Sequence, residues 1–277
     1  MERRPIDQFK AQQTDLQTRI VAYQNANLRL LAFKDAASDL ASATFFRGST
    51  ATISDTAVAT VTAEPGASEG DYSVTVSRLA RADQKVSQSF TDLDTTTIGT
   101  GTVTITSGGA TTSITIDSTN NTLSGLRDAI NRAKSNIRAS IVQDGDASYR
   151  LMIAARNTGT ANALTINSTL AGGTTPTFTT LQSAQDAEVT LGSGADAITV
   201  TRSTNSVRDL IPGVTLNLLT AAPNAPITVS VSQDTGKIKD AVQKFVEQYN
   251  NVVDFLNEQS KYDPDSEKGG TLLGDFT

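Results

Sequence analysis

The N-terminal stretch of the chain carries apolar residues at the spacing of a long, narrow helical stripe. From Ile6 to Phe46 there is neither Gly nor Pro, so nothing interrupts a helix there. The repeat is carried by Phe9, Leu16, Ile20, Tyr23 and Leu30. Because this spacing places side chains on one narrow face, the pattern predicts a helix of about 60 Å that packs in a coiled coil or bundle.

A second stripe lies near the other end of the chain and has no polar interruption. Its members alternate spacings of four and three residues, and they are Ile238, Val242, Phe245, Tyr249, Val252 and Leu256. Two helices that bracket everything else are expected to pack antiparallel as a helical stalk domain, residues 1–46 plus 237–277, with the middle of the chain inserted between them. The alternative is two unrelated amphipathic helices, each on its own β domain.

Both stripes are narrow, which favours packing with further helices in a bundle. The two predicted helices also differ in length. We therefore expect that additional helices complete the bundle and that the sequence is part of a longer chain.

The middle of the chain alternates apolar and hydroxylated residues with the period of β-strands. Residues 102–116 read as a hairpin that turns at Gly108 and Gly109, and a helix capped by Thr122 follows. The predicted core of this segment is Val103, Ile105, Ile114, Ile116, Leu123, Leu126 and Ile130. Further on, Asp144–Gly145 is predicted to join two more strands.

A related strand-and-cap pattern recurs in residues 187–214, which suggests that one unit is used in two neighbouring domains. We predict a middle β domain from 47–84 plus 184–236 and an outer α+β head domain from 85–183. The fold class is then α+β and multidomain, with a two-domain β-rich head inserted between antiparallel stalk helices. Flexible joints are expected near Thr50, Arg81 and Ala184.

Charge and composition narrow the functional classes. The formal net charge is −6, which argues against nucleic acid or an anionic membrane surface as the main partner. There is no Cys and no His, which removes thiol nucleophiles, disulfides, imidazole bases and most transition-metal sites. No stretch approaches the length and apolarity of a membrane span, and no cleavable signal is visible.

Candidate chemistry is weak throughout. Asp263, Asp265 and Glu267 alternate as at the start of a calcium loop, but Lys268 and Gly274 stand where such a loop needs Gly and Glu. No nucleophile-elbow, Walker or dinucleotide-binding pattern occurs. The sequence therefore predicts a protein that is not an enzyme and has no catalytic, cofactor-binding or metal site.

Four stretches, in order, resemble the FliD family of bacterial flagellar filament cap proteins, also called hook-associated proteins. They are the predicted first helix at 2–33, the Tyr-x-Val-x-Val-x-x-Leu-Ala signature within 65–84, the hairpin-and-helix module at 101–131, and the C-terminal stretches 197–219 and 245–275. The module alone is shared with some flagellins. The resemblance covers nearly the whole chain and implies a fragment that lacks the family's terminal segments.

This resemblance implies an oligomeric ring cap at the distal end of the filament. Such a cap promotes folding and insertion of flagellin, prevents loss of monomers, and leaves the cell by type III export, so it is secreted and extracellular and serves motility. The implied partners are other copies of the chain, flagellin, hook-associated proteins and an export chaperone. A host surface ligand for adhesion is neither supported nor denied by the sequence.

Two rival interpretations remain open. One is a flagellin-like or hook–filament junction protein, in which the stalk would be buried in a tubular lattice. The other is a secreted adhesin module, which would be expected to expose aromatic rings for sugar stacking. Tyr72 and Tyr149 sit in apolar alternation and are better explained as core.

Overall fold

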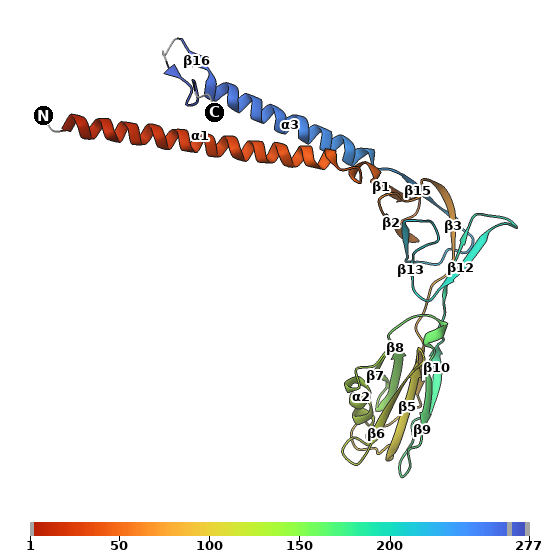
Figure 1. Cartoon of the computed structure of the whole chain (residues 1–277). Coiled ribbons are helices and arrows are strands. Elements are labelled where there is room, and N and C mark those ends of the chain that lie inside the picture. The colour runs from red at the N-terminus through yellow and green to blue at the C-terminus, as the bar shows by residue number, and fades with distance from the viewer. Residues whose placement is uncertain (1–2, 265–267, 275–277) are drawn as a thin grey trace. The chain divides into compact units, whose positions relative to one another are not determined.

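The computed structural model describes residues 3–264 and 268–274 (Figure 1). Chain contacts divide the protein into two compact units, one formed by 1–49 with 233–277 and the other by 50–232. Asp265 and Glu267, two members of the calcium-like pattern, lie outside the described residues.

The first unit is helical. Helix α1 spans Arg3–Ala41 and is followed by the short helix η1, Phe45–Arg47; helix α3 spans Thr235–Ser260. Asp234 caps α3 by accepting a hydrogen bond from the backbone N–H of Lys237 at 3.0 Å. After α3, a two-stranded ladder pairs β16 (Tyr262–Asp263) with β17 (Lys268–Gly269). Among the described helices, none has the length and apolar character needed to cross a membrane.

The second unit contains a first β core built by two sheets. The order of the five-stranded sheet is β1 (Ser49–Ile53), β15 (Ile227–Gln233), β3 (Gly70–Arg78), β11 (Ala187–Leu191) and β12 (Ile198–Arg202). The order of the three-stranded sheet is β13 (Ser206–Val207), β14 (Val214–Leu218) and β2 (Ala59–Ala63). Their aliphatic faces share one buried cluster in which Val74, Val229 and Leu216 are almost fully buried.

A second core in the same unit combines two further sheets with helix α2 (Leu123–Arg132). The four-stranded sheet runs β10 (Phe178–Gln182), β4 (Gln84–Ser87), β8 (Ser148–Ala155) and β7 (Ile137–Gly145). The three-stranded sheet runs β6 (Ala110–Ile116), β5 (Gly101–Ser107) and β9 (Thr165–Ser168), and the short helix η2 (Thr160–Asn162) precedes β9. Figure 1 shows α2 beside this pair of sheets.

The hairpin between β5 and β6 explains why residues 102–116 alternate as they do. Val103 pairs with Ile114 and Gly101 with Ile116, so one aliphatic face points into the second core. The turn uses Gly108 and Gly109 at φ 60° and 77°, a conformation that only Gly adopts without cost.

The two cores are connected by a hydrogen-bonded crossing of the chain. Arg81 N–H donates to Gln185 O at 2.8 Å, and Gln185 N–H donates back to Arg81 O at 3.0 Å. Gly159 N–H also donates to Arg81 O, at 3.1 Å. The segments before and after the second core are thus tied to each other and to a loop of that core.

Two polar side chains reinforce this crossing. Asn205 accepts from Ala80 N–H at 2.7 Å and donates to Ala80 O at 3.1 Å. The carboxylate of Asp186 accepts from both the backbone N–H and the hydroxyl of Thr160, each at 2.8 Å. These hydrogen bonds hold the two segments of the connection together. The flexible joints near Thr50, Arg81 and Ala184 stay predictions.

The fold is α+β with three α-helices among the described residues and mostly antiparallel sheets, as the sequence predicts. The two buried clusters draw on residues within the predicted middle and outer segments. A division of residues 50–232 into two domains stays a prediction, because the chain contacts group them as one compact unit.

The first prediction concerns the second core. Leu126 is fully buried between α2 and the sheets, so Leu126→Ala is expected to lower the free energy of unfolding by about 2–5 kcal/mol. Leu181→Ala, the same substitution at a side chain that is 60% exposed, is expected to change it by less than about 0.5 kcal/mol. Urea unfolding followed by circular dichroism measures both; equal losses would contradict this assignment of the core.

The second prediction concerns the crossing. Gly159 has φ 98°, and a Cβ there would lie 2.5 Å from the Ser203 Cβ, so Gly159→Ala is expected to destabilise the crossing by about 1–3 kcal/mol. Hydrogen exchange should show faster exchange of the Arg81 and Gln185 amides.

The matched control is Gly109→Ala, which has a comparable positive φ of 77° but nothing within 4 Å of the added Cβ. It is expected to leave exchange at the crossing unchanged. If Gly159→Ala also left those amides protected, the crossing would not depend on the close approach of this loop.

Candidate functional site

The described residues hold no group of three or more His, Cys, Asp or Glu side chains that could bind a metal ion. Three features are considered in turn: the helix pair, the buried core of the hairpin, and a polar cluster at the end of the second core.

Helices α1 and α3 contact each other through aromatic side chains and one arginine. The ring of Phe33 lies 5.1 Å from that of Phe245 and 5.9 Å from that of Tyr249. The Arg29 guanidinium lies 4.3 Å from the centre of the Phe255 ring, a cation–π contact. Because positions that fall along α1 meet positions that rise along α3, the helices run antiparallel.

The predicted stripe of α1 is not the face that contacts α3. Its residues are 41% to 71% exposed, and they are Phe9, Leu16, Ile20, Tyr23 and Leu30. The buried residues of α1 are instead Ala22 and Ala36. Arg29 and Phe33, which contact α3, lie on the same row of α1 as these two alanines, one position before the predicted row.

On α3 the predicted residues divide between two rows. Val252 is buried, and Ile238 and Phe245 are half-buried, whereas Val242, Tyr249 and Leu256 are 42% to 52% exposed. Phe255, which the spacing argument missed, is buried against α1. A row at spacings of three and four that included 248 and 255 would have found it.

The helix pair therefore presents apolar side chains that remain 42% to 60% exposed. On α1 these include Leu16, Ile20 and Leu30, and on α3 they include Val242 and Leu256. We call these five residues the exposed apolar stripe. Exposed apolar side chains of this kind are typical of surfaces that contact another helix or chain.

The predicted core of the outer segment lies in a single buried cluster. Every one of its residues is at most 5% exposed, and they are Val103, Ile105, Ile114, Ile116, Leu123, Leu126 and Ile130. Thr122 caps α2 by accepting from Gly125 N–H at 3.1 Å. These residues hold the shape of this part of the chain and are inaccessible to a partner.

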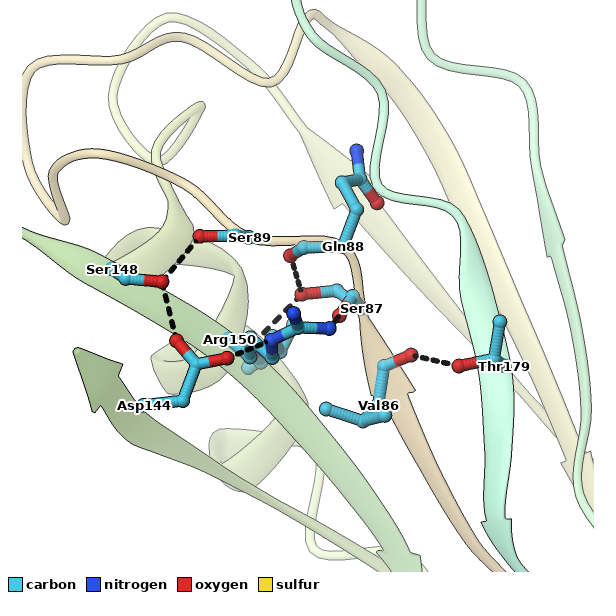
Figure 2. Close-up of polar contacts among 9 residues, drawn as sticks. Val86, Ser87, Gln88, Ser89, Asp144, Ser148, Arg150 and Thr179 are labelled. Atoms are coloured by element: carbon cyan, nitrogen blue, oxygen red, sulfur yellow. Dashed lines mark hydrogen bonds and ion pairs between the residues drawn. The ribbon is translucent and has the colours of Figure 1, made fainter.

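A polar cluster joins the hairpin β7–β8 to strand β4 (Figure 2). Ser89 and Ser148 share a hydrogen bond of 2.7 Å, Ser148 donates to Asp144, and Asp144 pairs with Arg150. Arg150 also donates to Ser87 O at 3.4 Å. The hydroxyl of Ser148 and then Arg150 lower the pKa of Asp144, so this carboxylate is a weak base and the cluster is suited to holding strands together.

The position of the turn between β7 and β8 differs from the predicted one. The hairpin turns at Asp146–Ala147, not at Asp144–Gly145, and Ala147 takes φ 53°. The ladder is irregular between Gln143 and Gly145, which turns the Asp144 side chain toward Ser148 and Arg150. A bulge of this kind depends on contacts across the strands, which a local turn rule does not contain.

Three family models match the chain. The Flagellar hook-associated protein 2 N-terminus matches residues 1–83, the Flagellar hook-associated protein 2 C-terminus matches 184–277, and the Flagellin hook IN motif matches 102–157. The third match lies over the hairpin and α2, which the first two leave uncovered.

Curated relatives and solved structures agree with these matches. The chain is 31% identical over 288 residues to Flagellar hook-associated protein 2 of Escherichia coli K12, covering 96% of this chain and 60% of the relative. It is 32% identical over 282 residues to the B-type protein of Pseudomonas aeruginosa, covering 93% and 59%. The chain thus spans about three fifths of the length of these relatives.

Among solved structures, the flagellar cap protein FliD D1-D2-D3 domains from Escherichia coli match with a TM-score of 0.74 and 30% identity, covering 92% of this chain and 73% of that one. FliD from Pseudomonas aeruginosa PAO1 matches with a TM-score of 0.61 and 29% identity, covering 74% and 97%. Sequence motifs, fold and structural likeness agree, and the chain belongs to the FliD family of flagellar hook-associated protein 2.

Proposed function

We propose that this chain forms part of a non-enzymatic cap at the distal end of the flagellar filament, outside the cell. The observation that carries the proposal is the family membership over nearly the whole chain, together with the exposed apolar stripe on the helix pair. The cap acts by shape and contact: it promotes folding and insertion of flagellin and prevents loss of subunits from the tip.

The surfaces that the chain leaves exposed are those through which the cap can contact other chains. The two β cores bury their aliphatic faces within the chain, and they form the proposed head of the cap. The exposed apolar stripe is the part of the stalk available for packing with further helices, in a coiled coil or bundle. The partners proposed on this basis are other copies of the chain in an oligomeric ring, flagellin and hook-associated proteins.

Three further features rest on the family alone. Export through the flagellar type III channel suits a chain without Cys, because no disulfide has to form or break during passage. An export chaperone for the full-length chain and a host surface ligand are the remaining proposals, and no described surface favours either one.

The third prediction tests the cap function directly. Deletion of the gene that encodes the full-length protein is expected to abolish filaments and to release monomeric flagellin into the medium, because subunits are no longer retained at the tip. Electron microscopy and immunoblots of culture supernatant measure both. Filaments of normal length in the deletion strain would contradict the cap function, and a plasmid copy of the gene serves as the control.

The fourth prediction tests the exposed apolar stripe. Replacing Leu16, Ile20 and Leu30 together by Ser in the full-length protein is expected to remove a helix contact outside the described structure. The polar replacements should leave the two β cores folded, since these side chains are 47% to 60% exposed. Filament length and number are expected to fall at least tenfold.

The matched control replaces Thr14, Gln17 and Gln24, three exposed polar residues on the neighbouring row of α1, by Ser. This variant is expected to support normal filaments. Equal filament growth with the two triple variants would show that the stripe is not used in assembly.

A further inference from the structure

The second core carries a concentration of positive charge, although the chain as a whole is acidic with a formal net charge of −6. Four exposed cationic side chains form it, at the end of α2, around the start of β7 and directly after β8, and they are Arg132, Lys134, Arg138 and Arg156. We call these four residues the basic patch. Asp128 lies on the same helix, but it already pairs with Arg127 at 2.7 Å.

Hydrogen bonds bring the segments of the basic patch together. The side chain of Asn131 donates to Ala139 O at 2.8 Å and accepts from Ala139 N–H at 2.9 Å, which holds the end of α2 against β7. Arg156 N–H donates to Asn136 O at 2.8 Å, and Arg156 Nε donates to Ile137 O at 3.2 Å. Residues 132–138 and Arg156 therefore share one region of the surface.

The charges of the basic patch are not neutralised within the chain. Across the described residues, none of its four side chains forms an ion pair with a carboxylate. The bonds from Arg132 Nε to Asp128 O and from Arg156 Nε to Ile137 O end on backbone carbonyls, which carry no net charge. Because like charges that are close together repel, a negatively charged partner would stabilise this surface.

The first core carries a concentration of the opposite sign. Its four exposed carboxylates lie between β2 and β3, on β3, and between β13 and β14, and they are Glu64, Glu69, Asp71 and Asp209. We call these four residues the acidic patch. Glu64 N–H donates to Gly213 O at 2.8 Å, and Ser68 N–H donates to Pro212 O at 3.0 Å, so the two loops of the patch are joined.

The acidic patch also keeps most of its charge. Arg208 lies beside Glu64 and Asp209, where the three residues line one small cavity. None of the four carboxylates forms an ion pair in the part of the chain that the structure describes. With one guanidinium beside four carboxylates, an excess of negative charge is left exposed.

We propose that the basic patch of one chain contacts the acidic patch of a second copy. Both patches lie within the compact unit of residues 50–232, so every copy carries the two halves of the contact, and this charge complementarity selects a second copy as the partner. Because the two halves differ, each copy keeps one patch free for a further copy, and such a head-to-tail contact can close into a ring. The inference rests on the proposed cap function, for which it names the surfaces that join neighbouring chains.

Sedimentation velocity of the purified chain tests the contact. Self-association is expected at about 20 mM salt and should weaken at least tenfold at about 500 mM, because salt screens interactions between exposed charges. Replacing Arg132, Lys134 and Arg138 together by Glu reverses the sign of the basic patch. This variant is expected to weaken self-association at least tenfold, since two acidic surfaces then face each other.

The reciprocal variant replaces Glu64, Glu69 and Asp71 together by Lys and is expected to cause a loss of the same size. An equimolar mixture of the two triple variants should associate, because one then offers two acidic surfaces and the other two basic ones. A chain that carries all six replacements should recover self-association to within threefold of the unaltered chain. A purely structural role of these residues would give neither recovery.

The matched control replaces Lys34, Lys239 and Lys244, three exposed lysines of α1 and α3, by Glu. It changes the net charge as much as the reversal of the basic patch does, and it is expected to change self-association by less than twofold. Circular dichroism checks that each variant folds. Should a triple variant not fold, Arg132→Gln with Arg138→Gln removes charge without reversing it and is expected to weaken association at least threefold.

Three outcomes would overturn the proposal: the unaltered chain stays monomeric at low salt, its association does not depend on salt, or neither the mixture nor the sixfold variant recovers association. A loss seen only on reversal of the basic patch would assign that patch to a different anionic partner and overturn the contact between copies. These measurements use the isolated chain, whereas the gene deletion measures filaments, so failure of the cap function and failure of the contact are distinguishable.

Discussion

The alternation of aliphatic and hydroxylated residues along the strands is the constraint on which both β cores depend. The chain has no Trp and only 5% aromatic residues, so its cores are built mainly from Val, Ile, Leu and Ala. Small β-branched side chains bury little area each, and many strands must contribute one face for a core to be stable. The opposite faces carry Thr and Ser, which leaves the outside of each sheet polar.

This alternation explains which parts of the fold are readable from sequence. The hairpin of residues 102–116 and the capped helix after it follow from local period and from the two adjacent glycines, and Val103 and Ile114 pair as expected. The turn of the next hairpin does not follow, because the bulge at Asp144 depends on Ser148 and Arg150 on the other strand. Local rules contain no cross-strand partners.

The helix pair shows the same limit in another form. Spacing identifies both helices, but it gives weight to large apolar residues such as Leu16 and Ile20, and these are exposed. The face that contacts α3 carries Arg29 and Phe33, together with the buried Ala22 and Ala36, and alanine and arginine give a weak apolar signal. Two adjacent rows of α1 thus differ: the row with Arg29 and Phe33 contacts α3, and the row with Leu16 and Ile20 is exposed to solvent.

The hydrogen-bonded crossing near Arg81 was equally hidden, because it joins segments more than a hundred positions apart and uses Asn205 and Asp186 as braces. The backbone hydrogen bonds tie the segment that enters the second core to the one that leaves it, and the loop that contains Gly159 contributes to the same connection.

Assembly with other chains explains why the helix pair keeps exposed apolar side chains. An exposed apolar stripe on helices is costly to a protein that works alone. A member of an assembly can keep such a stripe, because partner chains cover it. The exposed side chains of the helix pair therefore favour a protein that acts through contacts with other chains.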